Sequence, residues 1–158
     1  MTPRTVTILI AGETVPAGRP KFGTVRKRDG SSFVTAFTPA TTRKWQAEAR
    51  FIAQQQMGNQ PPLSGALTLK LTVYLPIPKS LSRIKTDQAL HGILRPTTRP
   101  DLDNYIKNLD AFNNLVWYDD SQIVTLMASK HYSDRPRVEI IVSENVPFVQ
   151  RSEQAQLL

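Results

Sequence analysis

The chain has 158 residues, a length typical of one domain with a hydrophobic core. Its 20 Lys and Arg outnumber its 13 Asp and Glu, and the resulting net charge of +7 favours a polyanionic partner such as DNA. The sequence has no cysteine, which excludes disulfides, thiolate zinc sites and a thiol nucleophile, and it has no apolar run of membrane-spanning length, so we expect a cytoplasmic protein without a membrane segment.

The amino-terminal part predicts a strand followed by a basic arm. Residues 5–11 alternate and are rich in β-branched side chains, as is typical of a strand. Residues 16–32 are interrupted by Gly and Pro, so they form either a long hairpin arm that clamps DNA or a solvated loop, with residues 32–37 as the returning strand. Phe22 could stack on a base or pack in the core. The basic residues of this arm, offset only by Asp29, are Arg19, Lys21, Arg26, Lys27 and Arg28.

A long helix and an alternating strand should supply most of the core. Thr38 is a suitable N-cap before Pro39 at the first helical position, and the helix should run to about Met57 with Trp45 on its apolar side. Residues 66–75 alternate between apolar and polar side chains, which predicts a strand with one buried face.

Residues 76–99 form a long irregular segment that leads into the most acidic part of the chain. A loop of this length inside one domain is usually functional or disordered, so we expect it to contribute DNA contacts, and a short helix could form around residues 80–90. The basic residues that we assign to DNA binding here are Lys79, Arg83, Lys85 and Arg99.

Five of the 13 acidic residues fall within residues 101–120. Pro100 favours extended backbone before a helix start. Within a helix, Asp101 and Asp103 would point about 200° apart and could not share an ion. We therefore expect Asp101 to be extended and Asp103 to lie at or near the helix start. Lys107 follows one turn later on the same face as Asp103.

A second acidic pair, Asp119 and Asp120, precedes the next predicted strand. Carboxylates held this close repel one another, and their hard oxygen atoms suit Mg²⁺ or Mn²⁺. An Asp-x-Asp pair alone is more often a helix cap, and two adjacent aspartates alone are more often a turn. The combination of both pairs with Lys107 favours a metal-dependent nuclease centre on a basic surface.

The carboxy-terminal part predicts two more strands, at residues 122–132 and 137–143, joined as a hairpin around residues 134–136. Residues 144–158 lack periodicity and read as a flexible tail. We therefore expect one α+β domain over residues 1–143, with a small mixed sheet of about four strands packed against two main helices.

At its acidic motif the sequence resembles the RusA-type endonucleases, the Holliday-junction resolvases of bacteria and phages. The resemblance rests on residues 100–104 (PDLDN) with Lys107, and on residues 117–124 (WYDDSQIV), with a weaker match at residues 15–22. In that family three aspartates bind the metal and a lysine assists cleavage. By motif these residues are Asp101, Asp103, Asp120 and Lys107.

The resemblance implies an enzyme that resolves four-way junctions by paired, symmetric nicks in DNA recombination and repair. It also implies Mg²⁺ (or Mn²⁺) as the cofactor, a homodimer, and no small-molecule cofactor. One departure concerns Asp110, which follows Lys107 one residue sooner than is usual and should be rotated by about 100°. Two alternatives remain: a metal-dependent nuclease that acts on flaps or other branched DNA, and a non-catalytic DNA-binding protein with a structural acidic cluster.

Overall fold

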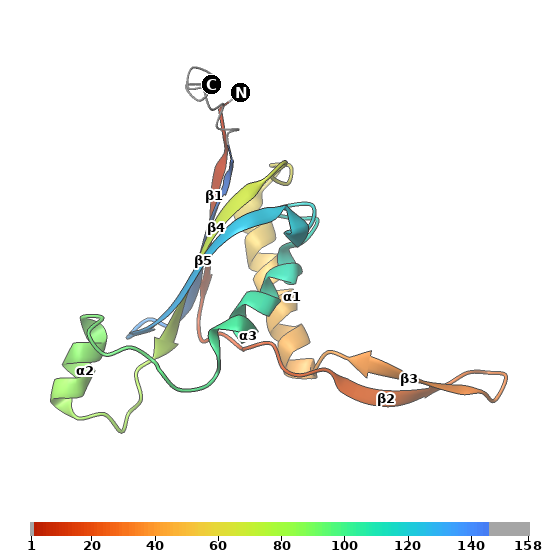
Figure 1. The fold of residues 1–158 in the computed structure, drawn as a ribbon, viewed down its shortest axis with the longest axis horizontal. Helices are drawn as coiled ribbons and strands as arrows, with labels where there is room; N and C mark the ends of the chain where they lie inside the picture. The colour runs from red at the N-terminus through yellow and green to blue at the C-terminus, as the bar shows by residue number, and fades with distance from the viewer. Residues whose placement is uncertain (1, 146–158) are drawn as a thin grey trace, which may run out of the picture.

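A four-stranded mixed sheet forms the centre of the fold (Figure 1). Its strands lie in the order β1-β6-β4-β5. The strands are β1 (Thr5–Ala11), β4 (Leu67–Pro76), β5 (Ile123–Ser133) and β6 (Arg137–Glu144). The computed structural model describes residues 2–145, so the tail predicted at residues 144–158 lies almost wholly outside the described residues. The predicted fold class, one α+β domain around a mixed sheet of about four strands, is confirmed.

Helix α1 (Ala40–Met57) lies on one face of this sheet together with α3 (Leu102–Ile106) and the 3-10 helix η1 (Lys107–Phe112) (Figure 1). The buried side chains of α1 recur at each turn and pack into the core. They are Thr42, Trp45, Ala49, Ala53 and Met57. The predicted Thr38 cap is wrong: Pro39 occupies the N-cap position without a side-chain cap, because its extended backbone delays the first helical residue to Ala40.

The predicted hairpin between residues 122–132 and 137–143 is wrong, because β4 lies between β5 and β6. β4 pairs in parallel with β5 and antiparallel with β6. Its inward side chains, from Leu67 to Val73, are almost fully buried, so the strand is most stable with a neighbour on each side. β4 ends at Pro76, which cannot extend the ladder, and the link at residues 134–136 passes its end.

Strands β2 (Lys21–Arg26) and β3 (Ser32–Phe37) form a separate two-stranded hairpin that projects from the rest of the domain (Figure 1). The hairpin interpretation of residues 16–32 is thus confirmed. Phe22 is 77% exposed, so its alternative placement in the core is wrong. We call residues 19–37 the arm.

Helix α2 (Arg83–Leu90) confirms the short helix expected around residues 80–90. Its N-cap is Ser82, whose hydroxyl oxygen accepts a hydrogen bond from the Lys85 amide at 3.3 Å. Within residues 2–145, no helix is both long enough and apolar enough to cross a membrane.

Candidate active site

The amino end of α3 presents the first acidic pair in the predicted way. Asp101 is the N-cap residue with extended backbone (φ −69°, ψ 150°), and Asp103 lies in the first turn. Both side chains are exposed. The Nζ atom of Lys107, one turn later, lies 3.1 Å from Oδ2 of Asp103, so the expected shared face is confirmed. The Lys107 ammonium thus lies beside the exposed carboxylate of Asp103 in the first turn of the helix.

Beyond Lys107 the helix tightens from α to 3-10 geometry as η1. With three residues per turn, a residue three positions later returns to the same face, whereas an α-helix would leave it about 60° away. Asp110 is therefore brought back to the exposed side that carries Lys107, and the buried side chains of η1 are its neighbours Asn108, Leu109 and Phe112. The change from α to 3-10 geometry thus offsets the rotation of Asp110 that the shortened spacing predicted.

Asp110 has a perturbed environment. Partial burial and the negative charge of Asp120 raise the pKa of the Asp110 carboxyl. The Gln46 amide donates to Oδ1 of Asp110 at 3.2 Å and to Oδ1 of buried Asn108 at 3.1 Å. Asp120, from the turn before β5, therefore lies close enough to Asp110 for their like charges to interact.

Asp119 and Asp120 have different roles in the 3-10 turn η2 (Asp120–Gln122). Asp119 is its N-cap, and a hydrogen bond from the Ser121 hydroxyl lowers the pKa of the Asp119 carboxyl. The Asp119 carboxylate is therefore engaged in capping this turn. Asp120 is exposed, and no ion pair within residues 2–145 engages it, so it is the member of the pair available for a ligand.

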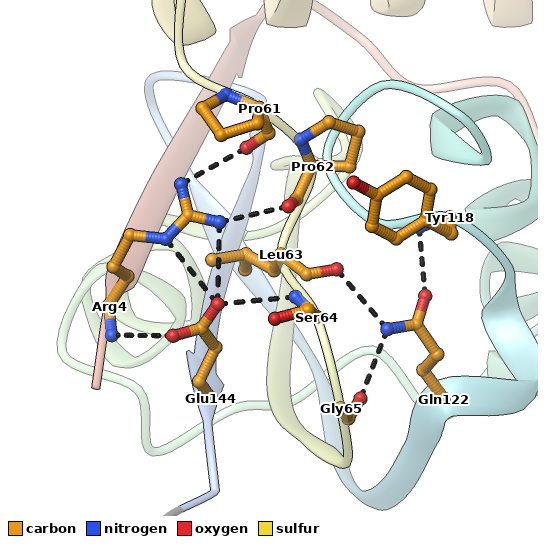
Figure 2. A network of polar contacts seen from close by, with 9 residues as sticks. All are labelled: Arg4, Pro61, Pro62, Leu63, Ser64, Gly65, Tyr118, Gln122 and Glu144. Atoms are coloured by element: carbon orange, nitrogen blue, oxygen red, sulfur yellow. Dashed lines mark hydrogen bonds and ion pairs between the residues drawn. The ribbon is translucent and has the colours of Figure 1, made fainter. Parts of the chain in front are cut away.

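Gln122 attaches this turn to the loop before β4 (Figure 2). Its Nε2 atom donates to the carbonyls of Leu63 and Gly65 at 3.2 and 3.0 Å, and its Oε1 atom accepts from the Tyr118 amide at 2.8 Å. The same loop is held from its other side by Arg4 and Glu144 (Figure 2). The turn that carries Asp120 is thus attached to the loop that leads into β4.

The predicted ligands Asp101, Asp103 and Asp120 do not form one cluster in the part of the chain that the structure describes. Asp103 pairs with Lys107 at one end of the α3–η1 segment, and Asp120 approaches Asp110 at the other. The rise from Asp103 to Asp110 is about 12 Å, from 1.5 Å per α-helical and 2 Å per 3-10 residue. Across residues 2–145, no three His, Asp or Glu side chains form a group that could hold a metal ion.

Lys130 is a residue of this region that the sequence motif does not identify. It lies on β5, and its ammonium donates to the carbonyls of Thr98 and Pro100, both at 2.9 Å. These carbonyls belong to the segment that leads directly to Asp101. A lysine in an alternating strand gives no sequence signal of this contact, because the contact depends on where the loop of residues 91–100 folds back.

The nine basic residues assigned to DNA binding are all exposed, and no ion pair within the described residues neutralises them. They fall into two groups. One group lies on the arm, and the other lies between β4 and α3. Their charges are available to phosphates.

The root of the arm is bonded to the helices that carry the acidic residues. The Ala17 amide donates to the Asn104 carbonyl at 2.8 Å, and Nδ2 of Asn108 donates to the Val15 carbonyl at 2.8 Å. Asn108 is only 2% exposed, so the donor of the second contact is buried. The basic arm and the acidic helix are therefore connected through short, direct contacts.

Comparison with known proteins identifies relatives of this arrangement. A family model described as endodeoxyribonuclease RusA matches residues 11–143. An uncharacterized protein, YqaN of Bacillus subtilis (strain 168), is 39% identical over 138 residues, which cover 85% of this chain and 93% of that protein. A crossover junction endodeoxyribonuclease of Lactococcus phage r1t is 52% identical over 50 residues, which cover 30% of this chain and 38% of the phage protein.

Proposed function

Because the chain belongs to the RusA family of endodeoxyribonucleases, we propose that it resolves four-way DNA junctions by hydrolysing phosphodiester bonds. The observation that carries this proposal is the arrangement of Asp101, Asp103 and Lys107 at the exposed start of α3, inside the region that matches the family. The phage relative is named for crossover junctions, which supports the same substrate for this chain.

The cofactor in this proposal is Mg²⁺, with Mn²⁺ as a substitute, held by Asp101, Asp103 and Asp120. Their carboxylate oxygens fit a hard divalent ion in kind. In the part of the chain that the structure describes, these three side chains do not form one metal-binding group. An ion shared by all three therefore requires Asp120 to approach Asp101 and Asp103. Such an ion would lower the pKa of a bound water and neutralise charge on the reacting phosphate.

Lys107 has a separate role in this proposal. Its side chain is 62% exposed, and its ammonium lies 3.1 Å from Oδ2 of Asp103, so the ammonium is oriented and the side chain is accessible. A phosphate oxygen that approaches the start of α3 would meet this positive charge, which would stabilise the negative charge that develops during cleavage. Loss of Lys107 should therefore slow cleavage more than it weakens DNA binding.

The DNA contacts and the oligomeric state complete the proposal. The unpaired basic residues of the arm and of the segment before α3 would bind the phosphate backbone on either side of the acidic residues. Two nicks placed symmetrically across a junction require two centres, so a C₂ homodimer is the expected form of the enzyme.

The decisive experiment is a cleavage assay on a synthetic four-way junction with Mg²⁺, Mn²⁺ or EDTA, in which the incisions in each strand are mapped. We expect paired incisions with either metal and none with EDTA. Asp103→Asn should abolish cleavage and preserve binding, while the control Asp134→Asn, an exposed turn residue, should cleave as the wild type does. Equal rates on junction, flap and plain duplex would refute junction resolution, and wild-type cleavage by Asp103→Asn would refute the assigned centre.

A further inference from the structure

The two faces of the arm differ in how their apolar side chains are covered. In the antiparallel register Phe22 lies opposite Ala36, and Thr24 lies opposite Val34. Because paired residues point to the same side, Phe22 and Val34 share one face with Arg26. Val25, Phe33 and Phe37 belong to the other face.

The face with Phe33 and Phe37 is covered within the arm itself. The ring of Phe37 lies over Gly23, where a Cβ atom would come within 2.7 Å of the Phe37 ring carbon Cε2. The ammonium of Lys27 lies over the ring of Phe33, 5.5 Å from its centroid. Both rings are 44% exposed.

The face with Phe22 has no such cover. At 77%, Phe22 is the most exposed large apolar side chain in the described part of the chain, and Val34 on the same face is 69% exposed. An isolated two-stranded hairpin is at best marginally stable in water, so an arm with this much uncovered apolar surface is suited to a partner.

The charge of the arm identifies the chemistry of that partner. Five cations and the single anion Asp29 lie within residues 19–29, so the same surface of a second copy would repel it. A nucleic acid satisfies both properties of the surface, because its phosphates pair with the cations and its bases stack on aromatic rings. Base-paired duplex offers no free base face, whereas the branch point of a junction does.

We propose that Phe22 stacks on a base at the branch point of the DNA and thereby makes the arm selective for branched over plain duplex DNA; this rests on the proposed function. Arg26, on the same face, contacts the adjacent phosphate. The bonds from Ala17 to Asn104 and from Asn108 to Val15 fix the root of the arm against α3 and η1. Stacking at Phe22 therefore sets where the scissile phosphate lies relative to Asp103.

The test compares Phe22→Ala with Phe51→Ala, a matched control on α1 where the phenylalanine is 61% exposed. Binding to a four-way junction and to a duplex of the same sequence is measured by fluorescence anisotropy in EDTA, so that cleavage does not interfere. Phe22→Ala should lose about tenfold in junction affinity, the effect of one base stack, and should retain duplex affinity. Phe51→Ala should match the wild type on both.

A second variant reports stacking directly. Phe22→Trp should restore junction affinity, and its fluorescence should be quenched by the junction but not by the duplex. The emission of the chain's own tryptophans, Trp45 and Trp117, should stay constant on DNA binding, because both are buried and shielded from the bases.

Three outcomes would overturn the stacking proposal: unchanged junction affinity in Phe22→Ala, an equal loss on junction and duplex, or a change in oligomeric mass by light scattering. The last result would mean that a second copy of the chain covers Phe22. Failure of the proposed function is a separate result, seen as wild-type protein that cuts no branched DNA with Mg²⁺. Quenching of Phe22→Trp by the junction would support stacking even then.

Discussion

The buried amide of Asn108 connects the acidic helix to the root of the arm, and its replacement by leucine has a calculable cost. Leucine has a similar size, so the change removes hydrogen bonds without leaving a large cavity. The Val15 carbonyl loses its 2.8 Å donor. The Gln46 amide loses one acceptor but keeps Oδ1 of Asp110 at 3.2 Å. One buried group is thus left unpaired, which costs about 1–3 kcal/mol.

Thermal unfolding followed by circular dichroism, with urea unfolding at 25 °C, measures this cost. For a chain of this length a loss of about 2 kcal/mol corresponds to a fall in Tm of about 4–8 °C. Asn59→Leu, at an exposed position after α1, is the matched control and should stay within about 0.5 kcal/mol of the wild type. If Asn108→Leu is as stable as this control, the Asn108 contact does not hold the arm root, and the coupling of arm to helix fails with it.

Three further predictions concern the acidic residues and their supports. Asp110→Asn should raise Tm at pH 7, because burial and the charge of Asp120 raise the folded-state pKa of this carboxyl and its ionised form therefore costs stability. The gain in Tm over wild type should shrink as the pH falls through the acid range, where the wild-type carboxyl becomes protonated. A pH-independent difference in Tm would contradict this prediction. Lys130→Met should reduce kcat for junction cleavage with little change in DNA affinity, since Lys130 holds the carbonyls of Thr98 and Pro100 beside Asp101; a pure affinity loss in the binding assay would argue against a positioning role. Mg²⁺ should raise the Tm of the wild type by relieving carboxylate repulsion, and Asp101→Asn should gain less; equal gains would remove Asp101 from the ligand set.

Local features were predictable from the sequence where one short stretch determines them. Asp101 and Asp103 would point about 200° apart within a helix, which predicted extended backbone at Asp101 and a helix start near Asp103, and both are observed. The four-residue spacing predicted the contact between Asp103 and Lys107. The alternation of residues 66–75 predicted the buried face of β4.

Features that depend on contacts between distant segments were not predictable in this way. β5 and β6 follow one another in the sequence, which suggested a hairpin. The strand β4, however, pairs with a neighbour on each edge and lies between β5 and β6. In the sequence, Lys130 is an ordinary polar residue of a strand. Its contact with the Pro100 carbonyl depends on how the loop before Asp101 folds over it. The position of Asp120 relative to Asp101 depends on the length of the α3–η1 segment, which the motif spacing does not reveal.

The change from α to 3-10 geometry after Lys107 explains how a shortened spacing can still keep an acidic residue on the exposed side. A 3-10 helix rises further per residue than an α-helix and completes a turn in three residues. Asp110 is thus carried away from Asp103, and its partial burial together with the charge of Asp120 raises the pKa of its carboxyl. Because like charges at this end of the segment repel, a divalent ion would stabilise Asp110 and Asp120 together as well as the pair at the start of α3. Asp110 should therefore be tested beside Asp120, with Asp110→Asn compared with Asp120→Asn in the cleavage assay.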